Sequence, residues 1–189
     1  AAGPSTTFTV DNSAPTVSIS APSATFTKTA SVTYTVSYTD TDGSGISAIT
    51  LATADITLNT TGTANGTVAV STSGATARTV TISGITGDGT LGISIIAGTA
   101  TDLAGAPVPA AGPSTTFTVD NTVPSVAIGA PSNTITARGP VSYTVTYADA
   151  NYSASTLAAA NVTLNTSGTA SGTVSVAGTG ATRTVTISS

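Results

Sequence analysis

The acidic side chains of this sequence are the residues best suited to chemistry, and they are all aspartates. The chain has eight Asp and no Glu, and His and Cys are absent. The common general bases and nucleophile activators are therefore missing, which argues against an enzyme. Carboxylate and amide oxygens without nitrogen or sulfur ligands are instead typical of Ca²⁺ sites.

The charge composition excludes two classes of partner. Only 6% of the 189 residues are charged, and the net charge is −4. The basic residues are isolated in the sequence, so no basic stripe for nucleic acid is present, and no apolar run is long enough for membrane insertion. These basic residues are Lys28, Arg78, Arg138 and Arg183.

An internal repeat organises the chain. The opening twelve residues, AAGPSTTFTVDN, return at 110–121, and matched residues further along lie 109, then 106, then 105 positions apart. The repeat predicts that 1–12 are the last strand and linker of a preceding repeat, 13–121 a complete domain, and 122–189 a domain without its final strands.

Short alternating runs bounded by Gly, Pro, Asn and Asp predict an all-β chain. The run 31–39, SVTYTVSYT, places Val and Tyr on one face and Thr and Ser on the other. The predicted strands of the complete repeat are 16–20, 24–27, 31–39, 47–51, 55–60, 66–71, 77–83, 90–98 and 113–119.

This number of strands without helices predicts tandem antiparallel β-sandwiches of the immunoglobulin kind, joined end to end. The Cys pair and the Trp of antibody domains are absent. Other side chains must therefore fill the centre, and we expect Tyr34, Val36, Ile82, Ile93 and Ile95 to do so.

Four segments carry a resemblance to a known family: YTVSYTDTDGSGI, TVTISGITGDGTLGISI, GTATDLAG and FTVDNTVP. They resemble the tandem bacterial Ig-like repeats of large cell-surface, adhesin and fibre proteins. The resemblance implies an extracellular location at the bacterial surface and a stalk, adhesin or fibre built of many domains.

In such a sandwich the aspartates fall at two predicted junctions between domains. The first is where the chain enters the complete domain, at Asp11, Asn12, Asp40, Asp42 and Asp102. The second is where it leaves that domain, at Asp88, Asp120, Asn121, Asp149 and Asn151. Calcium at these interdomain junctions would stiffen the array. The alternative is that each Asp caps its own turn.

The leading functional hypothesis is a structural segment of a bacterial extracellular filament or surface stalk, whose partners are neighbouring copies or repeats of the same protein. One alternative is an adhesin that binds a cell-surface or host ligand, with Tyr152 as the candidate aromatic contact. Another is a fibre subunit that assembles by donor strand, in which Thr7, Phe8, Thr9 and Val10 complete the sheet of the next chain. A tandem array predicts a native polypeptide far larger than 18.0 kDa.

Overall fold

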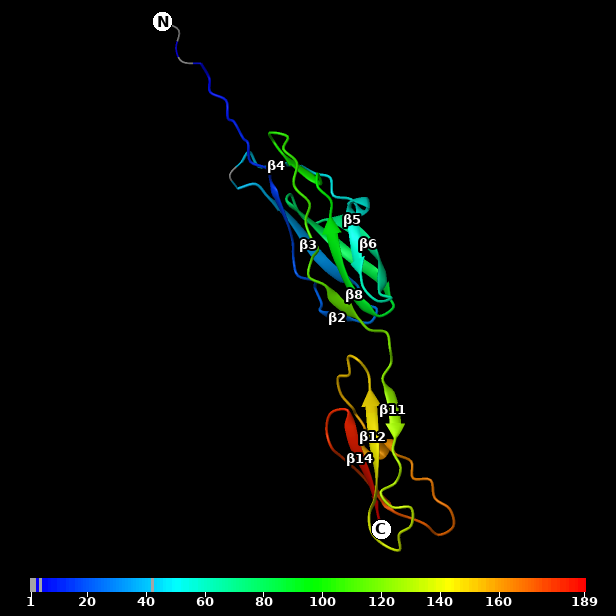
Figure 1. Ribbon diagram of the computed structural model, residues 1–189. Coiled ribbons are helices and arrows are strands. Elements are labelled where there is room, and N and C mark those ends of the chain that lie inside the picture. Colours follow the sequence, from blue (N-terminus) through cyan, green and yellow to red (C-terminus); the bar gives the residue numbers. More distant parts are fainter. Residues whose placement is uncertain (1–2, 4, 42) are drawn as a thin grey trace. The chain divides into compact units, whose positions relative to one another are not determined.

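The computed structural model describes residues 3, 5–41 and 43–189 (Figure 1). The chain divides into two compact units, Ala1–Asn121 (unit 1) and Thr122–Ser189 (unit 2). In the described residues the fold is all-β, apart from two three-residue 3₁₀ segments, η1 (Thr53–Asp55) and η2 (Ala159–Asn161). No helix among these residues is long and apolar enough to cross a membrane.

The first sheet of unit 1 is antiparallel and follows the period of two in its sequence. In β3 the side chains Val32, Tyr34, Val36 and Tyr38 are buried, and the residues between them are half-buried or exposed. The strands in order across the sheet are β1 (Thr16–Ile19), β3 (Val32–Thr39), β7 (Ala77–Thr86) and β6 (Asn65–Thr72).

The second sheet of unit 1 is mixed. Its β10 pairs antiparallel with β8 but parallel with β2, which corrects the prediction of purely antiparallel sheets. A parallel pair arises because β2 and β10 lie far apart in sequence and are not joined by a hairpin. The strands in order are β2 (Phe26–Thr27), β10 (Phe117–Val119), β8 (Gly89–Ile95) and β5 (Ile56–Thr60).

A third, two-stranded sheet pairs β4 (Ile46–Ile49) with β9 (Ala100–Asp102). The sequence patterns did not predict β9. It has three residues, and its pairing with a strand more than fifty positions earlier leaves no local signal.

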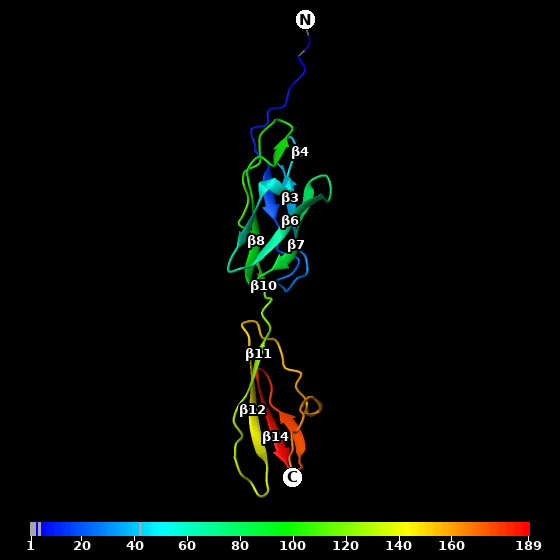
Figure 2. The same cartoon turned by 90° about the vertical axis from the view of Figure 1, so that its right-hand side faces the viewer.

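Figure 2 shows the strands of the two four-stranded sheets of unit 1. Buried side chains from both sheets form one hydrophobic core. All five expected core residues are buried. The two tyrosines of β3 also connect the layers. The Tyr34 hydroxyl donates to the Thr115 carbonyl at 2.8 Å, and the Tyr38 hydroxyl lies 3.0 Å from the Thr99 hydroxyl. Burial raises the pKa of both phenols.

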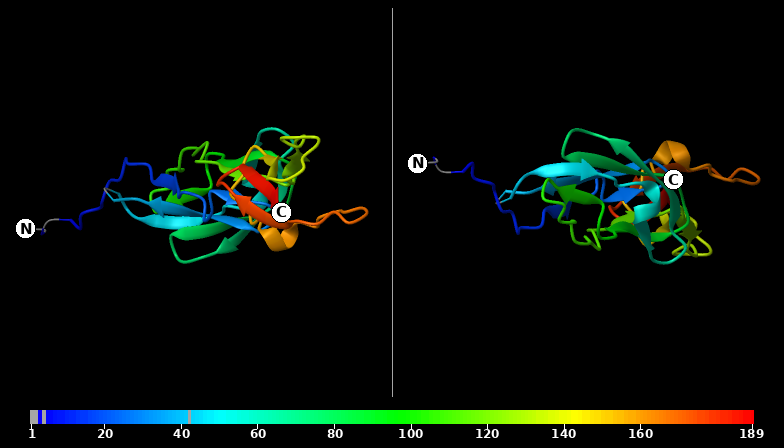
Figure 3. Two further views of the ribbon diagram at one scale, coloured as in Figure 1. Left: turned by 90° about the horizontal axis from the view of Figure 1, so that it is seen from below. Right: turned by 90° about the horizontal axis from the view of Figure 1, so that it is seen from above.

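Unit 2 contains a single four-stranded sheet in its described residues, and its order matches the first sheet of unit 1. The connection that carries η2 loops out beyond these strands (orange in Figure 3). The strands in order are β11 (Ser125–Ile128), β12 (Val141–Ala148), β14 (Thr182–Ser188) and β13 (Thr173–Ala177).

The described residues before β1 form no strand. Phe8 is 86% exposed and Val10 66% exposed, so the apolar side chains of this segment have no sheet to cover within unit 1. Its repeat at 110–121 behaves differently, because there Phe117 and Val119 are buried in β10.

Candidate metal site

Three aspartates from distant parts of unit 1 converge at one of its ends. Asp11, Asp40 and Asp102 each offer a carboxylate oxygen, and these three oxygens lie within 4.8 Å of one another. Asp11 belongs to the linker before β1, Asp40 directly follows β3, and Asp102 ends β9. The site therefore depends on the tertiary fold of unit 1.

The pairing of β4 with β9 positions the loop after β3, which carries Asp40, and the end of β9, which carries Asp102. Asp102 is paired with Ile46, and the Leu103 N–H donates to the Gly45 carbonyl at 3.1 Å. The Ala104 N–H donates to the Ser44 hydroxyl at 3.2 Å. These bonds fix the loop after β3 against the loop after β9, and thereby hold Asp40 close to Asp102.

Asp11 accepts hydrogen bonds from its own linker and from the loop after β3. Its Oδ1 accepts the Ser13 N–H at 2.9 Å, and its Oδ2 accepts the Ser44 N–H at 2.6 Å. A side-chain hydrogen bond from Ser44, followed by the backbone bonds from Ser13 and Ser44, holds the pKa of Asp11 below its usual value. The linker is thus attached to the loop after β3 through an ionised carboxylate.

The other two carboxylates also accept backbone N–H groups. Asp40 Oδ2 accepts from Gly45 at 2.7 Å, and Asp102 Oδ1 accepts from Ala106 at 2.7 Å. Gly43 provides the space for Asp40, because a Cβ at Gly43 would overlap the Asp40 carboxylate. Turn capping therefore occurs at each aspartate of the cluster.

Capping leaves one buried carboxylate oxygen of this cluster without a hydrogen-bond partner. Asp102 is 2% exposed, and its Oδ2 is buried without a hydrogen-bond partner. A buried carboxylate oxygen without a partner carries a large desolvation cost, and such groups in native proteins usually have a partner. A cation is one partner that would offset this cost.

The arrangement can bind a metal ion. The N–H donors around the three carboxylates are neutral, so they do not cancel the negative charge. Two oxygens bound to one Ca²⁺ lie up to about 4.6–5.2 Å apart, twice the usual Ca–O distance. The separation of up to 4.8 Å in the cluster falls within this limit.

The other two residues predicted for the first junction are Asn12 and Asp42. Asn12 is exposed beside Asp11. Asp42 lies outside the described residues. Ser44 was not among the predicted site residues, although it donates to Asp11. Its position within DTDGSG, after a predicted strand, was the available signal.

The residues predicted for the second junction belong to two units. Within unit 1, Asp88 Oδ1 accepts the Asn121 N–H at 2.5 Å, and the Asn121 side-chain amide donates to the Gly87 carbonyl at 2.7 Å. The Asp120 N–H donates to the Thr27 carbonyl at 3.1 Å. These bonds hold the outgoing linker on unit 1.

In unit 2 the aspartate caps its own turn. Asp149 Oδ1 accepts the Asn151 N–H at 2.7 Å. Asp55, the aspartate outside both predicted junctions, acts similarly in unit 1 and accepts the Ala52 N–H at 2.8 Å. Local capping is therefore a general role of Asp in this chain.

The aromatic candidate for ligand binding is packed within unit 2. Tyr152 stacks on Tyr147 with ring centroids 6.0 Å apart, and its hydroxyl donates to the Gly180 carbonyl at 3.1 Å. A side chain with these contacts serves the packing of unit 2.

The fold and the cluster define an all-β protein with a carboxylate site that can hold a metal ion. No protein-family model, curated protein or solved structure matches the chain. Its function is therefore inferred from the geometry of unit 1 and unit 2.

The depressed pKa of Asp11 predicts an acid-sensitive contribution to stability. The ionised carboxylate of Asp11 is stabilised in the folded state. Its contribution to stability is therefore complete at pH values above the unfolded pKa of 3.8, and it is lost as the pH falls through the lower pKa of the folded state. We expect wild type to have a higher melting temperature than Asp11→Asn near neutral pH, and we expect this difference to shrink below pH 3.8.

Calorimetric melting of wild type and of Asp11→Asn in chelator, from neutral pH to below 3.8, measures this difference in melting temperature. Ser44→Ala should weaken the same pH dependence, because it removes the side-chain donor to Asp11. A melting-temperature difference that does not change with pH would contradict this role for Asp11.

Proposed function

We propose that the chain is a structural segment of a bacterial extracellular filament or cell-surface stalk, built of tandem Ig-like β-sandwiches. One observation carries the proposal: unit 1 holds both of its linkers. Asp11 of the incoming linker is bound to Ser44, and Asn121 of the outgoing linker is bound to Asp88 and Gly87. A domain that binds both its incoming and its outgoing linker restricts the directions in which the chain enters and leaves it, as a stalk requires.

The composition supports the same role. The chain has few charged residues, no His or Cys, and sheets rich in Thr. Such residues give strand propensity without reactive groups. Immunogold electron microscopy with antibodies raised against unit 1 tests the proposal. Gold should follow extended structures outside the producing cells, and label confined to the cell interior would refute it.

We further propose that Asp11, Asp40 and Asp102 bind Ca²⁺ at the point where the linker enters unit 1. The ion would join the linker to the loops after β3 and β9, and the Asp102 Oδ2 atom supports this assignment because it is buried and has no partner. Waters would complete the six to eight oxygen ligands that Ca²⁺ commonly takes.

Calcium is expected to stabilise unit 1. A ligand that binds only the folded state at a hundred times its dissociation constant adds about 2.7 kcal/mol. Calorimetric melting of chelator-treated protein, with and without CaCl₂, measures the shift, and isothermal titration calorimetry counts the sites.

Two variants separate binding from general stability. Asp102→Asn should abolish the calcium-dependent shift, and Asp55→Asn should keep it, because Asp55 lies outside the cluster. An unchanged calcium response in Asp102→Asn, or the absence of any response in wild type, would overturn the site.

A further inference from the structure

The sequence contains a single asparagine–glycine pair, Asn65–Gly66, at the start of β6. Because a glycine has no side chain, its backbone nitrogen is open to the side-chain carbonyl carbon of the asparagine before it. Every other asparagine of the chain precedes a residue with a side chain, and most of these residues are Thr or Val. β-Branched side chains of this kind crowd their own backbone nitrogen. The side chain of Asn65 therefore has a chemical neighbour that the other asparagines lack.

Packing in unit 1 requires this glycine. A Cβ added at Gly66 would lie 2.8 Å from Cγ2 of Ile82, which is a fully buried residue of β7. The repeat keeps this relation, because a Cβ added at Gly172 would lie 2.8 Å from Cγ2 of an isoleucine of β14. The residue before Gly172 is Ser171, the counterpart of Asn65 at the offset of 106. The glycine is thus fixed by packing, whereas the asparagine is replaced by serine in the second copy.

The side chain of Asn65 is exposed and lies against the Gly66 nitrogen. The Gly66 N–H donates to Asn65 Oδ1 at 2.8 Å, and within the described residues this side chain has no other hydrogen bond. A C=O bond is about 1.2 Å long, so Cγ of Asn65 lies at most about 4.0 Å from the Gly66 nitrogen. Atoms poised to react are about 3–3.5 Å apart. A small rotation of an exposed side chain is therefore enough to bring these two atoms together.

The ladder between β6 and β7 does not fix Gly66. Asn65 is paired with Thr86, the next pair is Thr67 with Ser83, and the register shifts between these two pairs. Gly66 falls within the shift and has no partner residue in the register. Since a bulge of this kind disrupts the ladder locally, the backbone at Gly66 can turn more easily than it could within a regular pair of strands.

We propose that Asn65 is a site of spontaneous deamidation in which water is the only co-reactant. The Gly66 nitrogen loses its proton to hydroxide and attacks Cγ of Asn65. A bond from the Gly66 nitrogen to Cγ forms, and the bond from Cγ to Nδ2 breaks. Nδ2 takes a proton from water and leaves as ammonia. The product is a five-membered succinimide ring, and no atom is oxidised or reduced.

Water then opens the ring at either of its two carbonyl carbons. One opening gives an aspartate, and the other gives an isoaspartate, whose main chain runs through Cβ and Cγ. Both products add one negative charge to the net charge of −4. The aspartate keeps an oxygen that can accept the Gly66 N–H, so it should preserve the fold. The isoaspartate adds an atom to the main chain at the start of β6 and should lower the melting temperature of unit 1.

Anion-exchange chromatography and peptide mass spectrometry of the 189-residue protein test the site. During incubation at mildly alkaline pH, a species with one added negative charge should accumulate, and fragment spectra should place the new carboxyl group at position 65. The deprotonated fraction of a group whose pKa lies far above the pH rises about tenfold per pH unit. The rate of deamidation should therefore show the same dependence on pH.

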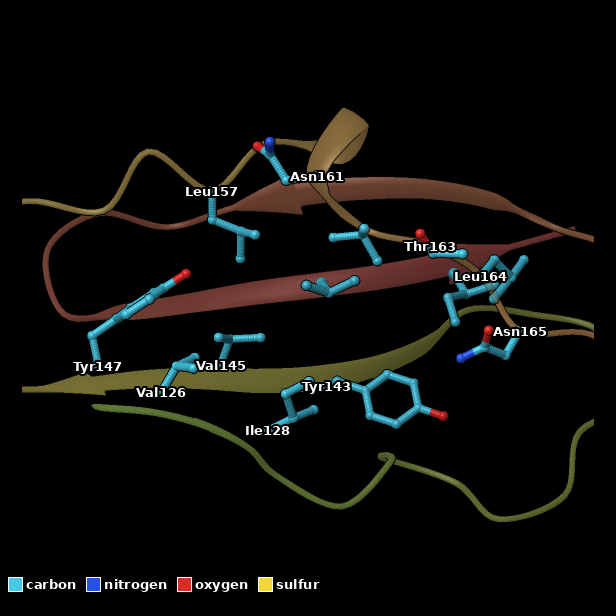
Figure 4. A pocket seen from close by; sticks show the side chains of 13 residues that line it. Val126, Ile128, Tyr143, Val145, Tyr147, Leu157, Asn161, Thr163, Leu164 and Asn165 are labelled. Carbon is cyan, nitrogen blue, oxygen red and sulfur yellow. The ribbon is translucent and has the colours of Figure 1, made fainter. Parts of the chain in front are cut away.

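Other asparagines of the molecule are internal controls. Asn59 lies in the same tryptic peptide, 29–78, precedes a threonine, and donates its side-chain amide to the Ser94 hydroxyl at 2.8 Å. Asn161 and Asn165 of unit 2 also precede β-branched residues (Figure 4). Each of these three should deamidate at least about tenfold more slowly than Asn65, because its reacting atoms are less well placed.

Asn65→Ser is the matched variant, since it reproduces the pair found at 171–172. It should remove the added-charge species and keep the melting temperature of wild type. Asn65→Asp reproduces one product and should elute with that species. The free peptide TANGTV gives the rate without the fold, and the folded protein should react within about tenfold of this rate.

Three outcomes would overturn the proposal. In the first, the folded protein reacts more than about a hundredfold more slowly than the peptide, which would show that the fold protects the pair. In the second, Asn59 reacts as fast as Asn65. In the third, the added-charge species persists in Asn65→Ser, which would place the modification at another residue.

Discussion

Replacement of Phe117 by alanine is expected to lower the free energy of unfolding of unit 1 by about 3–5 kcal/mol, the usual cost of removing a buried phenylalanine. Phe117 is 1% exposed and packs on Tyr34 between the two sheets. The cavity would open where the Tyr34 hydroxyl reaches the backbone of Thr115. Little of the structure around it can collapse, because both sheets contribute to the same core.

The chain provides its own control for this substitution. Phe8 lies in the same twelve-residue sequence and is 86% exposed. Local propensity is therefore matched between Phe8→Ala and Phe117→Ala. We expect Phe8→Ala to change the free energy of unfolding by no more than about 0.5 kcal/mol, as at other exposed positions.

Urea unfolding of the two variants, followed by circular dichroism at a concentration where the protein is monomeric, measures both free energies. Equal losses for the two variants would show that Phe8 is buried in solution. A loss below about 1 kcal/mol for Phe117→Ala would contradict its place in the core.

The all-β class and most strands could be predicted because their patterns are local. In β3, alternation of Val and Tyr with Thr and Ser reports directly which face is buried. The parallel pairing of β2 with β10 could not be predicted in this way. It depends on which edges meet after folding, and neither strand is long enough to fix its register by pattern.

The candidate site could likewise be predicted from the sequence only in part. Asp11, Asp40 and Asp102 could be placed near one another from the order of the strands, because each aspartate lies next to a predicted strand or linker. The burial of Asp102 depends on β9, which its short sequence did not indicate. The role of Ser44 depends on a backbone N–H whose direction only the folded loop determines.

Gly87→Ala is expected to destabilise unit 1 strongly and to loosen its outgoing linker. Gly87 lies between β7 and β8 with φ at +74°, and an added Cβ would overlap the Thr63 carbonyl. The left-handed conformation costs a non-glycine residue about 1–2 kcal/mol. Overpacking against the backbone adds about 1–3 kcal/mol. A total loss of roughly 2–5 kcal/mol follows.

Gly98→Ala separates these two costs. Gly98 has φ at +82°, but nothing lies within 4 Å of a Cβ added there. This variant should therefore lose only the conformational part, about 1–2 kcal/mol. Urea unfolding compares the two variants. Equal losses would mean that the turn at Gly87 can move away from Thr63 without cost.

The same turn connects stability to the role proposed for unit 1. The Thr63 N–H donates to the Asp88 carbonyl at 2.8 Å, and the Asp88 carboxylate and Gly87 carbonyl hold Asn121. Displacement of the turn by Gly87→Ala should therefore speed hydrogen exchange at the Asn121 amide, whereas Gly98→Ala should not. Unchanged protection at Asn121 would show that the outgoing linker is held independently of this turn.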